Sequence, residues 1–208
     1  MKKFLIVLVI VLAAFLAYKF AFQKKKPARE KPVPVAVSTH SEGFNKSVDA
    51  VLKRYFEMTD GFVNWDSAVV NAKAAELQQA LESFDLEDLK KDSIIYQTAL
   101  FPLENCKGSA ATIATSGDWT EKRRELQNLS DNLRMLLITV KFDQKVVYWN
   151  ECPMAFGEGQ IGNWLSEKDE IVNPYLGKKD PKYGASMLSC GENKMKIDFT
   201  QADSAKGK

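Results

Sequence analysis

The chain has 208 residues, with 29 lysines and arginines against 27 aspartates and glutamates, one histidine and three cysteines. Apolar residues make up 45% of it, which suits a globular protein and excludes a disordered or disulfide-dense chain. Residues 1–31 hold eight of the basic side chains and one of the acidic ones, so the rest holds 21 basic and 26 acidic residues. This net-acidic body argues against nucleic-acid binding.

The N-terminal segment is apolar and long enough to cross a membrane. Phe4 to Tyr18 is an unbroken apolar run, and residues 20–22 extend it past Lys19 to about 19 residues, near the roughly 20 that span a bilayer core. We expect residues 1–23 to form a membrane anchor. A cleaved signal sequence is the alternative, because two lysines precede the run, although no small-x-small cleavage site follows it.

Residues 24–44 have the composition of a linker. Pro27, Pro32 and Pro34 favour extended, unpacked chain, so we predict a flexible tether in which the single histidine, His40, is solvated. A packed body without histidine offers neither a Ser-His or Cys-His nucleophile pair nor a histidine-rich zinc site. The tether also has more basic residues than precede the apolar run, and charge alone would therefore place the body in the cytoplasm.

Four stretches follow in which apolar residues recur every three or four positions, the pattern of amphipathic helices. The first ends near Gly61, and the second begins around Asp66. The third begins just after Pro102. The fourth starts with a capping box, in which Asp118 is the N-cap and Glu121 is the third helical residue.

Short connections leave these helices only one another as partners for their apolar stripes. We therefore predict an antiparallel four-helix bundle over residues 45–141. The stretch from Leu86 to Phe101 has the weakest pattern and either lengthens the third helix or forms a separate piece. Cys106 falls on the apolar stripe of the third helix and is predicted to be a buried core thiol.

After the bundle the pattern changes to strands and turns. Residues 146–149 are strand-like, and the alternating residues 196–199 are predicted to pair with them. Glycines, prolines and aromatic residues crowd the sequence between the two. We predict a small irregular β/turn-rich module over residues 142–200, which forms one compact domain with the bundle, and a disordered tail over residues 201–208. The predicted fold class is mainly α, behind the N-terminal anchor.

Two short motifs of this module bring four sulfur-containing side chains, from Cys152 and Met154 and from Met187 and Cys190. Residues two apart in extended chain point the same way, so Cys152 and Met154 can face one centre. Met187 and Cys190 are three apart and can converge across one tight turn. Two thiolates with two thioethers suit Cu(I), and they suit zinc poorly because methionine is not a zinc ligand. These four residues are the candidate metal ligands, and we predict no catalytic residues.

A structural role for the same residues is the alternative. In an oxidising compartment, Cys152 and Cys190 would form a disulfide that closes a loop of about forty residues, adding about 3–4 kcal/mol in the chain-entropy account. Met154 and Met187 would then be ordinary core side chains. Both interpretations require the two cysteines to be neighbours.

Several motifs of the end module occur together in a known family. They are Val147–Trp149 ahead of Cys152–Ala155, then Gly162–Ser166, Ile171, Asn173–Tyr175, Gly177 and Met187–Gly191, with Arg123, Leu126, Leu129 and Ser130 on the last helix. Through these motifs residues 45–199 resemble the bacterial envelope family called domain of unknown function 3347. The resemblance is most specific in the end module and looser in the helical part. Residues 178–185 make the second sulfur motif more distant than in the shorter fused forms.

The resemblance implies a location and a role. Members occur alone behind a signal or anchor, and also fused to periplasmic adaptor subunits of heavy-metal efflux systems. This implies an inner-membrane anchor with the body in the periplasm, or a periplasmic protein if the signal is cleaved. It also implies a role in heavy-metal efflux or homeostasis, with Cu(I) as the metal and an efflux adaptor or another envelope protein as the partner. The family has no established activity, so we expect no enzyme. The alternative function is a non-catalytic interaction module with a Cys152–Cys190 disulfide.

Overall fold

The structure is a computed structural model that describes Tyr18 and residues 38–201. Apart from Tyr18, the predicted anchor lies outside the described residues, as do most of the predicted tether and the tail beyond Gln201. Among the residues that the structure describes, no helix combines the length and the apolar character needed to cross a bilayer. Residues 38–201 fall within one compact unit.

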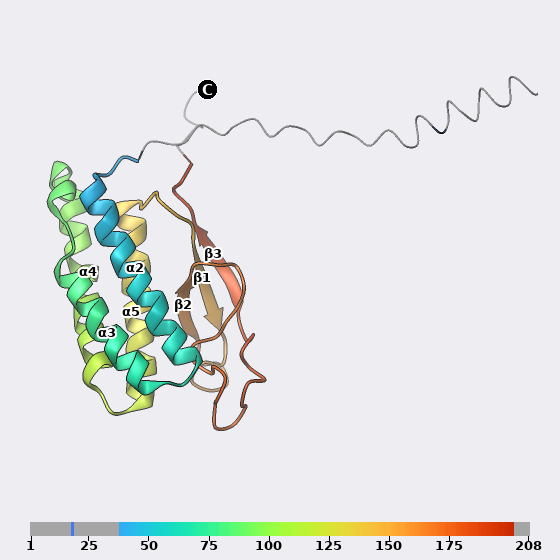
Figure 1. Ribbon diagram of the computed structural model, residues 1–208. Coiled ribbons are helices and arrows are strands. Elements are labelled where there is room, and N and C mark those ends of the chain that lie inside the picture. The colour runs from blue at the N-terminus through green and yellow to red at the C-terminus, as the bar shows by residue number, and fades with distance from the viewer. Residues whose placement is uncertain (1–17, 19–37, 202–208) are drawn as a thin grey trace, which may run out of the picture. The chain divides into compact units, whose positions relative to one another are not determined.

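Four α-helices and one short 3-10 helix lie in this unit. They are α2 (Glu42–Val63), α3 (Ser67–Glu82), the 3-10 helix η1 (Glu87–Lys91), α4 (Ser93–Thr115) and α5 (Trp119–Val140). Each α-helix is preceded by a residue whose side-chain oxygen accepts a hydrogen bond from an N–H group of the first turn, which satisfies a donor that has no partner within the helix. α2 packs against α3, α3 against α4 and α4 against α5, so the helices lie side by side (Figure 1).

The third predicted helix is longer than expected. α4 begins at Ser93, and Pro102 lies buried inside it rather than ahead of its start. The carboxylate of Asp92 fixes this start by accepting hydrogen bonds from the N–H groups of Ile94 and Ile95. A proline removes only one N–H group from a helix, and the apolar stripe continues on both sides of Pro102. The weakly patterned stretch thus does both things that the sequence allowed, because it forms η1 and also lengthens the helix.

The first helix also extends past its predicted end. α2 runs to Val63, two residues beyond Gly61. Gly61 serves packing instead, because a Cβ atom there would lie 2.9 Å from the side chain of Val70 on α3. The missing side chain therefore lets two helices approach closely, and it does not mark a helix end.

The predicted cap of α5 is present and has a third member. Asp118 accepts a hydrogen bond from the N–H group of Thr120, as an N-cap does. Glu121, however, accepts from the hydroxyl of Ser116 at 2.5 Å, and that hydroxyl accepts from the N–H group of Asp118 at 3.0 Å. The serine thus stands between the two members of the expected capping box.

Three strands form one antiparallel sheet in the end module. They are β1 (Val147–Cys152), β2 (Gly162–Ser166) and β3 (Glu192–Ile197), in the order β2-β1-β3. The predicted pairing between the two ends of the module is confirmed, with Val147 opposite Ile197. The prediction of turns alone between the two predicted strands is wrong, because residues 162–166 form the strand β2. Four of its five residues are buried, so it lacks the alternation by which a half-exposed strand is recognised.

The helices and the sheet share one hydrophobic core, with α5 packed against β2 (Figure 1). A buried tyrosine joins the two parts. The hydroxyl of Tyr55 on α2 accepts from the N–H group of Leu165 at 3.1 Å and lies 2.6 Å from the hydroxyl of Ser130 on α5. Ser130 donates its own proton to the carbonyl of Leu126, so Tyr55 donates to Ser130. One phenol therefore links α2, α5 and β2.

The corner between α2 and α3 holds the loop that precedes the second sulfur motif. Trp65 donates its indole N–H to the carbonyl of Leu176 at 2.9 Å, and the N–H group of Lys178 donates to the carbonyl of Val63 at 2.8 Å. Gly177 has a φ of +55° and a Cβ atom there would lie 2.7 Å from the same carbonyl, so only glycine fits. This end of the module is thus fixed to the helices.

The side chain of His40 is packed against the helices and is not solvated. It was predicted to be solvated in a tether over residues 24–44, yet its side chain is 11% exposed and its ring stacks on Phe44 with centroids 4.4 Å apart. Its Nε2 lies 2.8 Å from the carbonyl of Val140, at the end of α5, and its Nδ1 lies 3.2 Å from the carboxylate of Asp88. The last carbonyls of a helix have no partner within it, and His40 supplies one. The packed body therefore includes residues 38–44.

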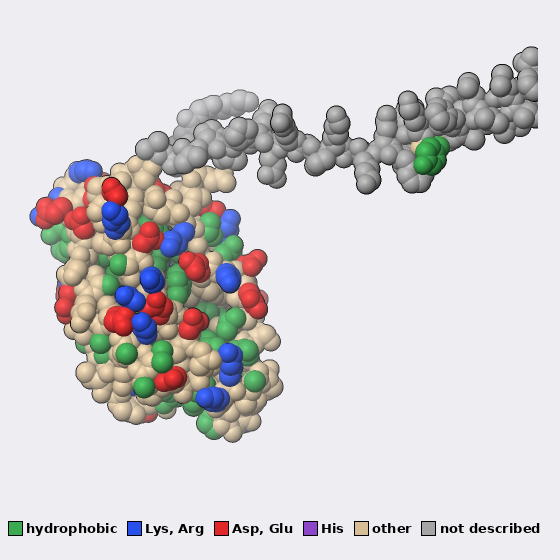
Figure 2. Space-filling view, in the orientation of Figure 1, with side chains coloured by type: hydrophobic (Ala, Val, Ile, Leu, Met, Phe, Trp, Pro, Cys, Tyr) green, Lys and Arg blue, Asp and Glu red, His purple; other side chains and the backbone are tan. Residues whose placement is uncertain are grey.

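Charged side chains are interspersed on the face that Figure 2 shows. Between α2 and α3, Arg54 and Lys73 pair with Glu57 and Glu76. Pairs this exposed to solvent contribute little to stability, because water and salt screen their charges. The apolar core, not these ion pairs, therefore holds the helices together.

Candidate metal centre

The first cysteine of the candidate site ends the central strand. Cys152 is the last residue of β1, is fully buried and lies opposite Gly162 on β2. A Cβ atom on Gly162 would lie 2.9 Å from the ring of Tyr175, so glycine at this position makes room for that ring. After Cys152 the chain turns, and the N–H group of Gly157 donates to the carbonyl of Met154 at 3.3 Å. Met154 is half-buried at the edge of the core.

The second cysteine lies in a tight turn directly before β3. The N–H group of Cys190 donates to the carbonyl of Met187 at 3.0 Å, which closes the turn. Gly191 follows with a φ of +142°, and a Cβ atom there would lie 2.8 Å from the carbonyl of Glu151. Glycine is therefore required where the chain leaves the turn and enters the sheet. Both Met187 and Cys190 are half-buried.

The structure brings the two cysteines together. Their sulfur atoms are 2.7 Å apart, and both side chains are free thiols. The two residues are 38 positions apart in the sequence, and β1 and the turn before β3 meet there because β1 and β3 are paired. Each methionine lies in a turn next to one of the thiols along the chain.

The charges around the pair favour a site that holds one negative charge more readily than two. Burial, followed by the hydrogen bond and the negative charge of Cys152, raises the pKa of the Cys190 thiol. The second thiol therefore ionises with difficulty unless a cation arrives.

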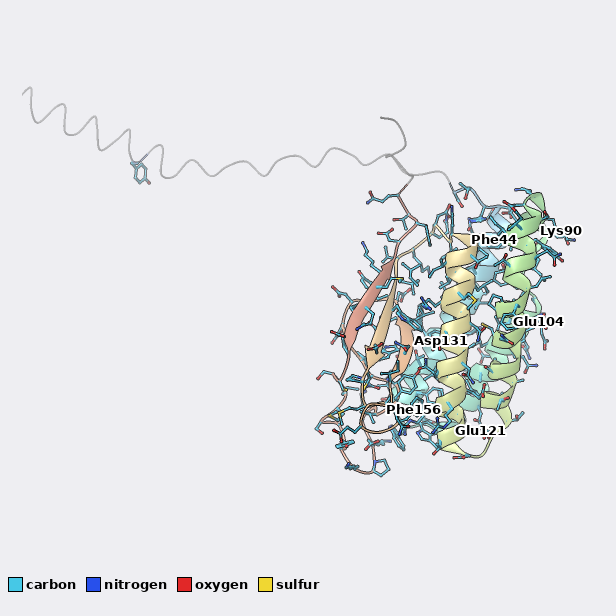
Figure 3. All side chains as sticks on the ribbon, turned by 180° about the vertical axis from the view of Figure 1, so that it is seen from behind. Phe44, Lys90, Glu104, Glu121, Asp131 and Phe156 are labelled. Atoms are coloured by element: carbon cyan, nitrogen blue, oxygen red, sulfur yellow. The ribbon has the colours of Figure 1, made fainter. Side chains whose placement is uncertain are left out.

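An arginine contacts the turn that follows Cys152. Arg123 of α5 donates to the carbonyl of Ala155, and its guanidinium carbon is 5.5 Å from the centre of the Phe156 ring, which lies beside the N-terminal half of α5 (Figure 3). Burial lowers the pKa of Arg123, whereas the charges of Asp180 and Cys152 act in the opposite direction. No local pattern marks Arg123 for an electrostatic role, because the contact depends on the packing of α5 against the module.

The remaining cysteine is a core residue. Cys106 is fully buried on α4 and its thiol lies 3.9 Å from the carbonyl of Leu129 on α5. Burial raises the pKa of this thiol well above its ordinary value. The prediction of a buried core thiol is confirmed.

Harder metal ligands do not gather elsewhere in residues 38–201. No group of three or more histidine, cysteine, aspartate and glutamate side chains there has the geometry to hold a metal ion. A cleft of about 270 Å³ lies between α2 and the segment after β2, lined by Phe56, Asp60, Trp164 and Lys168 among others, and it includes none of the four sulfur residues. Of the four candidate ligands, the structure therefore brings the sulfur atoms of Cys152 and Cys190 into contact, and no contact of the Met154 or Met187 sulfur with them is among those described.

Residues of the helical part match a known protein family. A family model described as "Protein of unknown function (DUF3347)" matches residues 51–145, which cover most of α2, all of α3, α4 and α5, and the loop before β1. Beyond residue 145 the end module, with both cysteines of the pair, lies outside the matched residues, although the sequence resemblance is expected to be most specific there. No curated protein and no solved structure matches the chain significantly.

Proposed function

Because the chain belongs, through residues 51–145, to this family of unknown function, we propose a role from the geometry of its sulfur atoms. The protein is a membrane-anchored envelope protein that binds a soft metal ion, Cu(I), and acts as an accessory to heavy-metal efflux or homeostasis. The observation that carries the proposal is the 2.7 Å separation of the sulfur atoms of Cys152 and Cys190. It is a binding function and includes no catalytic step.

The donor set fits a soft ion. Cysteine thiolates and methionine thioethers select Cu(I), and the proposed ligands are Cys152, Met154, Met187 and Cys190. Two sulfur atoms that share one metal lie roughly 3.5–4 Å apart. The 2.7 Å pair therefore has to open by about 1 Å. We assign this shift to Cys190, which is half-buried in a turn, whereas Cys152 lies in a paired strand.

The charge balance supports the same ion. One Cu(I) between two thiolates leaves a net charge of −1 in a buried place, and Arg123 offers the compensating positive charge. Because thiols must lose protons to bind metal and the pKa of Cys190 is raised, affinity falls as pH falls. The half-exposed Cys190 gives a transfer partner access to the ion.

The proposed setting follows the sequence. Residues 1–23 anchor the protein in the inner membrane, residues 24–44 contain the tether, and the body lies in the periplasm. The four helices serve as an antiparallel bundle that carries the end module. The proposed partner is an efflux adaptor or another envelope protein that exchanges the ion.

The test is a competitive Cu(I) titration of the reduced full-length protein. We compare Cys152→Ser, Cys190→Ser, Met154→Leu and Met187→Leu with the parent, and use Cys106→Ala as the matched control for loss of a thiol away from the pair. We expect each cysteine variant to lose about 100-fold in affinity, each methionine variant about tenfold, and the control to be unchanged. Equal affinity in all six proteins would overturn the proposal.

A second candidate function rests on the same distance. A separation of 2.7 Å is shorter than that of two sulfur atoms sharing a metal, which favours a pair that can be joined as a disulfide. The end module would then be a stapled, non-catalytic interaction module. Thiol counting on protein purified without reductant separates the candidates, since one free thiol indicates the disulfide and three indicate an available metal site.

A further inference from the structure

A buried asparagine next to the second sulfur motif forms hydrogen bonds through its side-chain amide, its side-chain oxygen and its backbone N–H group. Asn173 has no exposed surface, and its side-chain amide donates to the carbonyl of Cys190 at 2.8 Å. Its side-chain oxygen accepts from the N–H groups of Tyr175 at 2.8 Å and Leu176 at 3.1 Å. Its backbone N–H donates to the carbonyl of Leu188, also at 2.8 Å. One residue thus connects two turns of the end module.

The two turns differ in how they are held. The turn that begins at Asn173 is closed by a hydrogen bond from Gly177 and is fixed to the helices through the indole of Trp65. By contrast, few of the hydrogen bonds described for residues 185–190 connect this segment to the rest of the molecule. Apart from the contact between the two sulfur atoms, the hydrogen bonds described for residues 185–190 either stay within residues 183–190 or come from Asn173.

We propose that Asn173 is the positioning residue that holds the sulfur of Cys190 opposite that of Cys152. This inference rests on the proposed function only in taking the two thiols to be the site. Asparagine is suited to the role because it needs both a donor, for the carbonyl of Cys190, and an acceptor, for two N–H groups. Aspartate has nearly the same shape and keeps the acceptor but loses the donor.

The test measures how well the fold holds the two thiols together, without any metal. In a Cys106→Ala background, protein is equilibrated with reduced and oxidised glutathione. One glutathione disulfide takes two electrons from the two protein thiols, and two reduced glutathiones and one protein disulfide result. The equilibrium constant is the effective concentration of one thiol at the other. Replacing Asn173 by aspartate or serine is expected to lower this effective concentration about tenfold, because the carbonyl of Cys190 loses its buried hydrogen-bond donor.

Asn163→Asp is the matched control. Asn163 is also buried in the sheet, and its side-chain amide likewise donates to a carbonyl, that of Asn150, at 3.1 Å. It has no contact with residues 185–190 among those described. In Asn163→Asp we expect the effective concentration of one cysteine thiol at the other to stay within about twofold of the parent value. A fall of the same size in both aspartate variants, or no fall at position 173, would overturn the proposal.

A second measurement keeps the proposal falsifiable if the variants at position 173 fail to fold. In the parent, native-state hydrogen exchange of the Cys190 amide is expected to share one opening free energy with the amides of Tyr175 and Leu176, because Asn173 links them. Independent opening would overturn the role of Asn173. If the parent binds no Cu(I) while the variants at position 173 still show the tenfold loss, the proposed function is overturned and this inference stands.

Discussion

The helical part and the end module are held together in different ways. The helices have a periodic apolar stripe and a side-chain cap within a few residues of each start, so their interactions are largely local in the sequence. The end module depends on buried and half-buried side chains that reach distant backbone groups. Tyr55 contacts Leu165, 110 positions away, and Trp65 contacts Leu176, 111 positions away. A short irregular segment cannot satisfy its own backbone groups, and side chains from elsewhere must do so.

This difference explains where the candidate site lies. A regular helix fixes its side chains rigidly, whereas a turn held by one residue can shift. The dithiol combines both, with Cys152 on a paired strand and Cys190 in a turn that Asn173 connects to the rest. A rigid donor beside an adjustable one suits a site that both captures and releases an ion.

The largest effect is expected in the helical core. Leu52→Ala on α2 removes a fully buried side chain and leaves a cavity, so we expect a loss of about 3 kcal/mol in the free energy of unfolding. Ile94→Ala on α4, where 76% of the residue is exposed, is the control and should change stability by less than about 0.5 kcal/mol. Urea denaturation measures both. Similar losses in the two variants would contradict a core held by the apolar stripes.

The next largest loss of stability is expected where the helices meet the sheet. Tyr55→Phe leaves the buried N–H group of Leu165 without an acceptor, at a cost of about 2 kcal/mol. The amide of Leu165 should also exchange faster with solvent than before. Tyr148→Phe on β1 removes a hydroxyl of a partly exposed tyrosine and should be nearly neutral. If Tyr55→Phe matched that control, the phenol would not be a link between helices and sheet.

Local patterns made most of the helical part predictable. The caps at Asp66 and Asp118 and the spacing of apolar residues are readable within a few positions, so existence and order of the helices followed. Pro102 was misread because a strong cap upstream and a continuous stripe outweigh one missing donor. β2 was missed because burial on both faces removes its alternation.

The site could be predicted only in part. Spacing identified the two sulfur motifs, and the structure brings Cys152 and Cys190 together. Arg123 and Asn173 occur in the motifs that carry the family resemblance, but their roles depend on contacts between distant segments, which no local pattern reveals. His40 shows the same limit. The composition of residues 24–44 is typical of a linker, whereas the partners of His40, Asp88 and Val140, lie 48 and 100 positions away in the sequence.

A buried lysine gives a smaller effect that depends on pH. Lys122 has no exposed surface, donates to the hydroxyl of Ser67 at 3.0 Å and to the side chain of Asn71, and burial lowers its pKa. The unfolded chain therefore binds the proton more readily than the fold does, so the cost of charging this lysine grows as pH falls below about 10.4. Lys122→Met should raise stability by about 1 kcal/mol at pH 7, with a gain that shrinks toward pH 10.

The control for that prediction is Lys53→Met on the exposed face of α2, where no such gain is expected. Thermal unfolding over a series of pH values compares the two variants. A gain at Lys122 that does not vary with pH would mean that the lysine is buried without its charge being costly. The helical part would then tolerate a polar group inside it as well as the end module does.

The smallest effect is expected where the segment before α2 meets the helices. Hydrogen bonds from Lys91 first, and then from His40, hold the pKa of the Asp88 carboxyl below its ordinary value. A lowered carboxyl pKa adds stability above the unfolded pKa of about 3.9, and that stability is lost as pH falls through the folded value. Asp88→Asn should therefore cost about 0.5–1 kcal/mol at pH 7 and flatten the acid limb of the stability profile below about pH 4. Asp85→Asn serves as the control, because Asp85 lies three positions before Asp88 and belongs to none of the ion pairs described for residues 38–201. An unchanged acid limb in Asp88→Asn would contradict this prediction. His40 would then be held only by its stacking on Phe44 and by the carbonyl of Val140. An apolar contact and a helix end, rather than a charge, would hold this segment against the helices.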